Sequence, residues 1–402
     1  MYSVIPDSLI IKNDTKILFL ILDGLGGLAE KEYGGTELQV ARTPNLDALA
    51  SKSSCGLLTP ISPGITPGSG PGHFALFGYD PVETNIGRGV QEAAGIGFPL
   101  QEKDVAARFN FATVDKEGKV IDRRAGRIST EENKRICEKL RKNINLGSQV
   151  EVFVETVKEH RGVLVLRGEG LRDEVKDTDP KQVGLPPLDP IPLKPEAGKT
   201  AELLKEFISQ AKNLLASEEK ANMLLLRGLA KNKGYPSLKE RFGLNAVAIA
   251  SYPMYKGIAH LLGMTVIPDL STIDEEIEAL KANSEKFDFF FFHVKYTDSR
   301  GEDGNFMEKV KVIEEVDKLL PDILSLKFDV VVVTGDHSTP AKMAAHSWHE
   351  LPVLIYADTC RVDTVTKFDE ISCIQGALGH LRTKDLMTLA LAHAQRLEKF
   401  GA

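Results

Sequence analysis

The sequence predicts a two-domain α/β protein in which the larger domain has a mostly parallel central sheet. The chain has 402 residues, which is more than one ordinary hydrophobic core holds. Several short apolar runs end in an acid or a glycine-rich turn, and this pattern indicates buried parallel strands. The pattern changes in the middle of the chain. We therefore expect a discontinuous domain of residues 1–100 and 241–402, and a smaller inserted α/β or α+β domain at 101–240.

The composition argues against several classes of protein. A net charge of −7 with 42% hydrophobic residues fits a globular protein and argues against a nucleic-acid partner. Four separated cysteines without a CxxC pair indicate neither a zinc ribbon nor a disulfide framework, and they favour a reducing compartment. The N-terminus lacks a signal-peptide pattern, and its longest apolar run is too short for a bilayer. We expect a cytoplasmic protein with no membrane partner, and homo-oligomerisation stays open.

The first segment carries two features that bear on chemistry. Residues 1–15 are weakly patterned and are expected to form a surface arm, and Ile17–Leu22 is a buried strand that ends in Asp23. This acid is a candidate ligand, with a turn or capping aspartate as the alternative. After a short helix from Thr43, the glycine- and proline-rich loop 63–73 displays Ser69 ahead of an apolar stretch. Ser69 is a candidate nucleophile, and a flexible turn is the alternative.

The central region combines short strands, helices and many basic residues. Strands are expected at 105–114 and 163–166, helices at 129–140 and 200–215, and a proline-rich connector at 184–195. A converging subset of the basic residues would bind phosphate and carboxylate groups, whereas scattered solvated arginines are the alternative. These residues are Arg108, Arg123, Arg124, Arg127, His160, Arg161, Arg167 and Arg227.

The last segment returns to the buried-strand pattern. Strands are expected at 245–250, 287–294, 330–333 and 351–356, with helices at 272–282 and 383–399. Two of these strands are followed by further candidate ligands, which are Asp298, Glu302, Asp336, His337 and His346. Helix N-terminal acids are the alternative interpretation of Asp298 and Glu302.

These candidates share one structural logic. Parallel strands bring their carboxyl ends to one edge of a sheet, so groups hundreds of residues apart converge there. Mixed carboxylate and imidazole ligands suit Mn²⁺ or Zn²⁺, whereas Mg²⁺ prefers oxygen. The candidates exceed the needs of one ion. Two ions about 4 Å apart would lower the pKa of a serine hydroxyl and stabilise phosphoryl transfer.

Seven motifs run in order along the chain, as Leu22–Gly26, Thr43–Asp47, Pro67–His73, Leu76–Pro81, Asp122–Arg127, Lys295–Gly304 and Thr334–Pro340. Together they resemble the archaeal-type cofactor-independent phosphoglycerate mutases of the alkaline phosphatase superfamily. The resemblance implies an alkaline-phosphatase-like three-layer domain with an inserted substrate domain. It also implies interconversion of 3-phosphoglycerate and 2-phosphoglycerate through a phosphoserine, without bisphosphoglycerate.

The resemblance also assigns roles to residues. Ser69 matches the nucleophile; Asp23, Ser69, Asp336 and His337 match one metal site, and Asp298, Glu302 and His346 match a second. Mn²⁺ is the first choice of metal, with Mg²⁺ or Zn²⁺ as alternatives. The expected substrate contacts are His73, Arg123, Arg124, Arg127, His160, Arg161, Arg167, Arg227 and Lys256.

Two departures from the family pattern leave alternatives open. Glu302 stands where a histidine is common, and Gly70 follows the serine where an acid is common, so Thr66 remains a second candidate nucleophile. A phosphomonoesterase or another phosphomutase of the superfamily is the alternative enzyme. A relative that binds metal without catalysis is the alternative that is not an enzyme.

Overall fold

The computed structural model describes residues 7–84 and 86–401, which form two compact units. The first unit comprises residues up to 85 together with 236–402, and the second comprises 86–235. These limits lie fifteen and five residues before the expected starts at 101 and 241. The helix α4 (Arg88–Gly95) accounts for the larger difference because it packs on the strands of the second unit.

The first unit contains an eight-stranded, mostly parallel sheet in the order β13-β2-β12-β11-β1-β10-β8-β9. The five strands from β11 to β9 run parallel, and only β12 is antiparallel to its neighbours. The mixed α/β fold class with a mostly parallel sheet is therefore confirmed. The strands are β1 (Ile17–Leu22), β2 (Ser54–Thr59), β8 (Ala246–Ala250), β9 (Thr265–Val266), β10 (Phe289–Val294), β11 (Val330–Thr334), β12 (Leu351–Ala357) and β13 (Gly379–Arg382).

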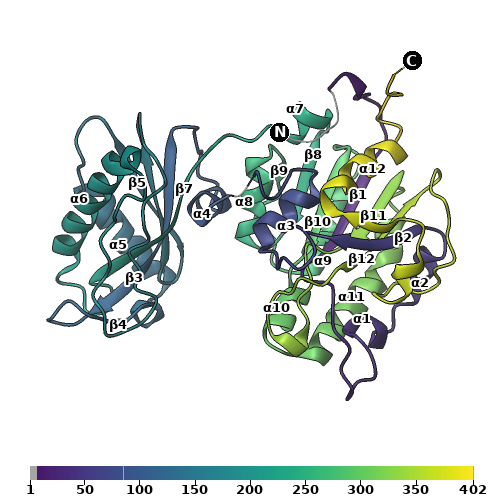
Figure 1. Cartoon of the computed structure of the whole chain (residues 1–402), viewed down its shortest axis with the longest axis horizontal. Helices are drawn as coiled ribbons and strands as arrows, with labels where there is room; N and C mark the ends of the chain where they lie inside the picture. Colours follow the sequence, from purple (N-terminus) through teal and green to yellow (C-terminus); the bar gives the residue numbers. More distant parts are fainter. Residues whose placement is uncertain (1–6, 85, 402) are drawn as a thin grey trace. The chain divides into compact units, whose positions relative to one another are not determined.

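Helices cover both faces of this sheet, which makes three layers (Figure 1). One face packs Leu18, Leu20 and Leu22 against α2, α9 and α11. Phe291, on the opposite face, contacts Phe77 at the end of α3. The helices are α1 (Glu37–Val40), α2 (Pro44–Ala50), α3 (Ser69–Leu76), α7 (Leu238–Phe242), α8 (Pro253–Leu261), α9 (Ile273–Asn283), α10 (Tyr296–Glu302), α11 (Phe306–Leu324) and α12 (Leu386–His393).

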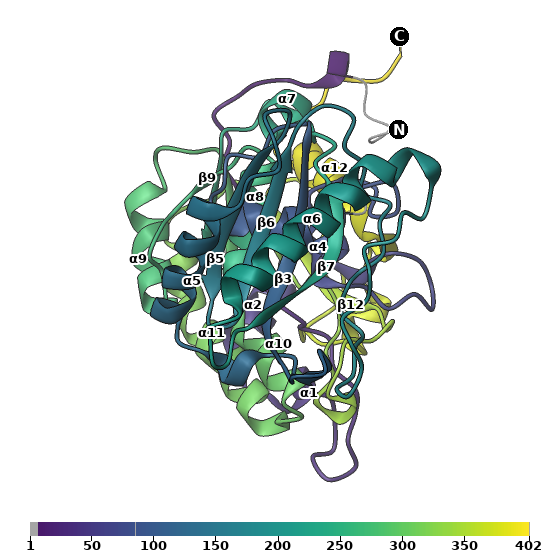
Figure 2. The same cartoon turned by 90° about the vertical axis from the view of Figure 1, so that its left-hand side faces the viewer.

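The second unit is an antiparallel sheet with two helices on one face. The strands are β3 (Asp104–Val114), β4 (Val120–Asp122), β5 (Glu151–Lys158), β6 (Arg161–Arg167) and β7 (Met223–Lys231), and β3 pairs with β4, β6 and β7. The helices α5 (Thr130–Asn143) and α6 (Gly198–Leu215) lie against this sheet (Figure 2). Ser129 caps α5 by accepting a hydrogen bond from the Glu132 amide, at the expected start of this helix.

The two ends of the chain differ from expectation. The predicted helix 383–399 is a short 3-10 turn followed by α12, which ends at His393. Gln395 has a φ of 53°, so the helix cannot continue through it. The chain then pairs with residues 9–11 of the predicted N-terminal arm, of which residues 1–6 lie outside the described part. No helix in the described ranges is both long and apolar enough to cross a bilayer.

Candidate metal and anion sites

A cluster of buried ligand-type side chains lies at the carboxyl ends of three neighbouring strands. Asp23 follows β1, Asp298 lies in α10 just after β10, and Asp336 with His337 follows β11. Asp23, Asp336 and His337 are completely buried, and Asp298 is 1% exposed. The parallel arrangement thus brings together groups separated by more than 300 residues, as the strand pattern predicts.

The ligand atoms form two overlapping groups that share His337. Asp23, Asp336 and His337 make one group, and Asp298, His337 and His346 make the other; within each group the ligand atoms lie within 4.8 Å of one another. Glu302 does not belong to either group. Its Oε1 lies 3.6 Å from His346 Nε2, and its side chain is 54% exposed. We expected two separate sets of metal ligands. In the structure the two groups overlap, because His337 belongs to both.

Ser69 lies beside this cluster as the first residue of α3. Its Oγ is 3.3 Å from His337 Nε2, whereas Thr66 is exposed in the preceding loop. Gly72 explains how the helix approaches so closely, because a Cβ at this position would come within 2.6 Å of the Asp336 carbonyl oxygen. Of the two candidate nucleophiles, Ser69 is therefore the one next to the ligand cluster.

His73 has a different place from the expected substrate contact. Its side chain is completely buried, and its Nδ1 lies 2.9 Å from the Ser69 carbonyl oxygen and 3.2 Å from Asp336 Oδ2. Burial lowers the pKa of His73 to about 4, so the ring is neutral near pH 7. A residue enclosed in this way supports Asp336 and α3, and it offers no surface to a substrate.

The electrostatics of the cluster fit a bound divalent cation. Burial and the nearby Asp23 carboxylate raise the pKa of Asp336 well above its usual range. Burial acts in the same direction on Asp23, but Lys295, His293 and His337 outweigh it and hold the pKa of Asp23 well below its usual value. Asp23 Oδ1 and Asp336 Oδ2 are buried, and among the described residues neither accepts a hydrogen bond of good geometry, although His73 Nδ1 lies 3.2 Å from Asp336 Oδ2. A cation between these oxygens would relieve both their repulsion and their lost hydration.

Several members of the site were not assigned from the sequence. Lys295 contacts the carboxylates of both Asp23, at 3.1 Å, and Asp298. Tyr255 in α8 donates a hydrogen bond to Asp23, and His293 Nε2 lies 3.5 Å from the same carboxylate. The strand pattern could have indicated His293 and Lys295, because they lie at and just after the carboxyl end of β10. No such pattern indicated Tyr255, because it comes from a helix with ordinary apolar spacing.

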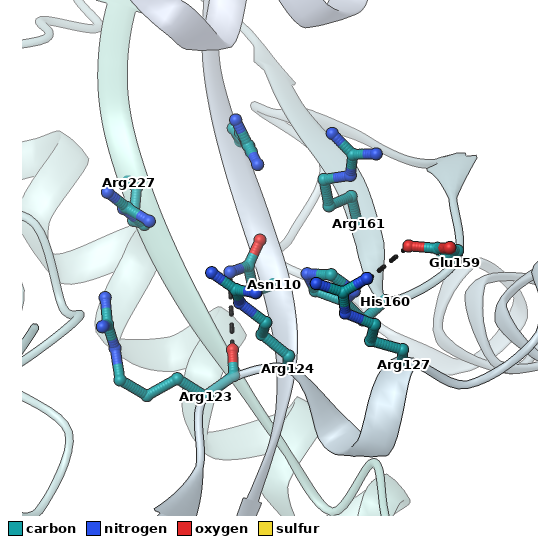
Figure 3. Close-up of a pocket in the computed structure, with 9 residues that line it drawn as sticks. Asn110, Arg123, Arg124, Arg127, Glu159, His160, Arg161 and Arg227 are labelled. Atoms are coloured by element: carbon teal, nitrogen blue, oxygen red, sulfur yellow. Dashed lines mark hydrogen bonds and ion pairs between the residues drawn. The ribbon is translucent and has the colours of Figure 1, made fainter. Parts of the chain in front are cut away.

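A cavity of about 290 Å³ lies in the inserted unit and is lined mainly by arginines (Figure 3). Its lining residues are Arg108, Asn110, Arg123, Arg124, Arg127, Glu159, His160, Arg161 and Arg227. Burial and the neighbouring Arg161 lower the pKa of His160 to about 4, so this ring stays neutral near pH 7. Such a concentration of guanidinium groups suits an anion that carries phosphate or carboxylate oxygens.

The arginines of the cavity have different partners. Arg123 forms a bidentate pair with Asp179, and Arg108 Nη1 lies 3.2 Å from Glu92 Oε1. Arg124 and Arg127 are exposed, and neither makes an ion pair with any residue that the structure describes. The cavity therefore keeps positive charge that its own carboxylates do not neutralise.

Besides His73, two more of the expected substrate contacts lie outside this cavity. Arg167 is held by Asp104 through two hydrogen bonds of 2.7 and 2.8 Å, and its guanidinium packs over Phe153. Because Asp104 pairs with Arg167 across β3 and β6, this arginine has a structural partner and does not line the cavity. Lys256 belongs to α8 of the first unit. The positions of these two residues do not support a role in the arginine cavity.

Comparisons with known proteins agree with the resemblance. Residues 50–221 match the family model for 2,3-bisphosphoglycerate-independent phosphoglycerate mutase. A Thermus thermophilus protein named as a probable enzyme of this type is 51% identical over 394 residues, which is 97% of each chain. A protein of the same name from Aquifex aeolicus is 50% identical over 98% of each chain.

Solved structures extend the likeness to the fold. A protein from Pyrococcus horikoshii is 31% identical, with a TM-score of 0.80 over 97% of this chain and 100% of that chain. The cofactor-independent phosphoglycerate mutase from Thermoplasma acidophilum is 30% identical, with a TM-score of 0.73 over 94% of this chain and 100% of that chain. The chain therefore belongs to the family of 2,3-bisphosphoglycerate-independent phosphoglycerate mutases.

Proposed function

We propose that this enzyme is an isomerase that interconverts 3-phosphoglycerate and 2-phosphoglycerate in glycolysis and gluconeogenesis. The reaction proceeds through a phosphoserine at Ser69 and uses no bisphosphoglycerate. The observation that carries the proposal is the position of Ser69 Oγ, 3.3 Å from His337 Nε2 at the edge of the buried carboxylate cluster. The family names of the relatives support the same substrate pair.

The ligand groups would hold two divalent ions. Asp23, Asp336 and His337, with Ser69, would bind one ion, and Asp298 with His346 would bind the other, with Glu302 as a further ligand. Mn²⁺ is our first choice for this mixed oxygen and nitrogen donor set, and Mg²⁺ and Zn²⁺ are the alternatives. When bound, the ions would lower the pKa of the serine hydroxyl and neutralise charge on the phosphoryl oxygens.

The chain itself positions the nucleophile and the group that it receives. Ser69 begins α3, so a phosphoryl group on its Oγ lies near the positive end of the helix dipole. In the first step the Ser69 Oγ–phosphorus bond forms while the bond from phosphorus to the glycerate oxygen breaks. In the second step the other glycerate hydroxyl attacks phosphorus, and the serine hydroxyl is restored.

The arginine cavity of the inserted unit supplies the contacts that retain glycerate between the two steps. Guanidinium groups bind carboxylate and phosphate oxygens in a bidentate manner, and Arg124, Arg127 and Arg227 line the cavity with His160 and Arg161. A retained glycerate competes with water for the phosphoserine. Retention therefore favours transfer over hydrolysis.

A coupled assay from 3-phosphoglycerate to pyruvate, without added bisphosphoglycerate, tests the proposed function. The full-length enzyme should turn over after chelation only when Mn²⁺ or another divalent ion is returned. Release of free phosphate without isomerisation would instead indicate a phosphomonoesterase. An absence of metal-dependent turnover with any phosphoester would indicate a relative without catalysis.

Ser69→Ala tests the nucleophile, with Thr66→Ala as the matched control. Ser69→Ala should reduce turnover by at least about 10⁴-fold, because it removes the group that forms the intermediate. It should also remove any acid-stable phosphoenzyme detected by mass spectrometry. Normal turnover in Ser69→Ala together with a strong loss in Thr66→Ala would move the nucleophile to Thr66.

We also propose a cytoplasmic location. Cys55, Cys137, Cys360 and Cys373 are all free thiols, which supports a reducing compartment.

A further inference from the structure

Asp179 does not line the arginine cavity, but it pairs with two arginines that do. Its Oδ1 accepts a hydrogen bond from Arg123 Nε at 2.9 Å, and its Oδ2 accepts one from Arg123 Nη2 at 2.7 Å. Arg227 Nε lies 3.4 Å from the same Oδ2. The Asp179 side chain is completely buried, whereas the side chains of Arg123 and Arg227 are 29% and 31% exposed.

The backbone around Asp179 explains why its side chain is fixed. Thr178 is joined to Leu226 of β7 by two hydrogen bonds. Its amide donates to the Leu226 carbonyl, and its side-chain Oγ1 accepts from the Leu226 amide. Further along, the Val120 amide of β4 donates to the Leu185 carbonyl. The segment therefore ties β7, which carries Arg227, to β4, which precedes Arg123.

The carboxylate is charged despite its burial. Burial alone would raise the pKa of Asp179, but the hydrogen bonds from Arg123 and the Lys181 amide, together with the charge of Arg227, lower it below its usual value. An arginine has five N–H donors, and the pair with Asp179 uses two of those on Arg123. Three donors of Arg123 remain, in an orientation that the pair fixes.

We propose that Asp179 is a positioning residue for substrate binding, which holds Arg123 and Arg227 so that their remaining donors face the anionic groups of a small phosphorylated acid. This inference rests on the proposed function of the cavity. Arg124 and Arg127, which have no such partner, attract the anion by charge. Arg123 and Arg227 define the geometry in which it binds.

The same unit contains a matched pair away from the cavity. Asp104 is also completely buried and holds Arg167 through two hydrogen bonds of similar length. Asp104→Asn therefore removes the same kind of interaction, and a similar amount of stability, without changing a residue that contacts the cavity arginines. It separates positioning of the substrate from general stabilisation of the unit.

The experiment compares Asp179→Asn, Arg123→Lys and Asp104→Asn in the full-length Mn²⁺-supplemented enzyme. Steady-state assays give kcat and KM, and calorimetry gives the Kd of 3-phosphoglycerate in the Ser69→Ala background, where the ligand is not converted.

Asp179→Asn should raise KM and Kd about tenfold and leave kcat within about threefold, because binding geometry is lost while the reacting groups are intact. Arg123→Lys keeps the charge but not the bidentate pair, so it should weaken binding similarly. Asp104→Asn should lower the unfolding temperature and leave Kd unchanged.

Each outcome decides between the possibilities. A wild-type Kd in Asp179→Asn, or an equal loss in Asp104→Asn, would overturn the positioning role and leave the proposed function intact. If Asp179→Asn does not fold, a wild-type Kd in Arg123→Lys overturns it in the same way. Binding of 3-phosphoglycerate that Asp179→Asn weakens, without any mutase turnover in the wild type, would support the positioning role and refute the mutase function. A wild type that binds no 3-phosphoglycerate refutes both.

Discussion

The two units concentrate opposite charges, and they expose these charges to water very differently. In the first unit Asp23, Asp298 and Asp336 lie together with at most 1% exposure. In the second unit Arg124 and Arg127 are exposed at the edge of an open cavity. Burying like-charged carboxylates together is costly unless a cation joins them, whereas guanidinium groups in contact with water pay little to remain charged. This contrast supports our proposal that the first unit holds cations and that the second binds an anion.

Among substitutions that remove a charge, Asp23→Asn should produce the largest effect, because it changes the enclosed cluster. We expect turnover to fall by about a hundred- to a thousandfold, the size seen when an electrostatic contact to a transition state is lost. Bound Mn²⁺, measured by elemental analysis, should fall with it. Asp269→Asn, at an exposed position of the same unit, is the control. Full metal content and normal turnover in Asp23→Asn would remove this carboxylate from the site.

Glu276 tests what burial does to a carboxylate outside the ligand cluster. It lies in α9 with 1% exposure, and burial raises its pKa from 4.5 to about 7. The unfolded chain loses the Glu276 proton at a lower pH than the folded protein does. The free energy of unfolding should therefore decrease as the pH rises from about 4.5 through 7. At about 1.4 kcal/mol per pKa unit the loss is up to roughly 3 kcal/mol.

Glu276→Gln should remove this pH dependence, measured by urea unfolding at pH 5 and pH 8. The control is Glu278→Gln, two positions further along the same helix, where the side chain is 74% exposed and pairs with Lys281. An identical pH dependence in Glu276→Gln and the wild type would show that Glu276 is already ionised at low pH in the folded protein.

Arg124→Gln tests the open, cationic cavity. We expect KM for 3-phosphoglycerate to rise about ten- to thirtyfold, or roughly 1.4 to 2 kcal/mol, because one charged contact to the anion is lost. The effect should shrink in high salt, since the cavity is open to water. Arg135→Gln, an exposed arginine paired with Glu132 and Glu218, should leave KM unchanged. A normal KM in Arg124→Gln would place the substrate elsewhere.

Glu302→Gln should have the smallest effect, because this side chain is only partly enclosed. We expect less than a tenfold loss of affinity for the second metal ion, in contrast to the loss at Asp23. Titration of metal-free enzyme with Mn²⁺ measures it, with the neighbouring Asp303→Asn, 64% exposed, as the control. An unchanged titration would remove Glu302 from the ligand set.

The parallel sheet made much of the first unit predictable. Asp23 and Asp336 directly follow apolar strands, so a general rule about strand ends was enough to bring them together. Tyr255 and Lys309 follow no such rule. Lys309 comes from α11, is completely buried, and donates to the carbonyls of Gly24 and Thr339. The sequence of α11 has the pattern of an ordinary amphipathic helix, so only the tertiary packing reveals that Lys309 contacts the site.

The second unit was predictable in composition but not in geometry. The sequence indicates an arginine-rich anion site, yet Arg108, Arg161 and Arg227 lie on antiparallel strands, where the register decides which side chains meet. Arg167 was expected in the site because its partner Asp104 becomes visible only once β3 and β6 are aligned. Asp179 was not assigned because it comes from a segment without a strand pattern, so the sequence does not show that it meets Arg123.

The position of β1 in the sheet has a consequence for how the chain folds during synthesis. Its partners are β10 and β11, and Ile17 pairs with Phe289 and Val330. At about 5–20 residues per second, the ribosome needs roughly 15 to 55 seconds to produce the first of these partners after β1. All strands of the inserted unit lie within 86–235, so that unit has its complete set of strands first. The apolar strand that precedes Asp23 therefore remains unpaired for most of translation, and it is the segment on which we expect a nascent-chain chaperone to act.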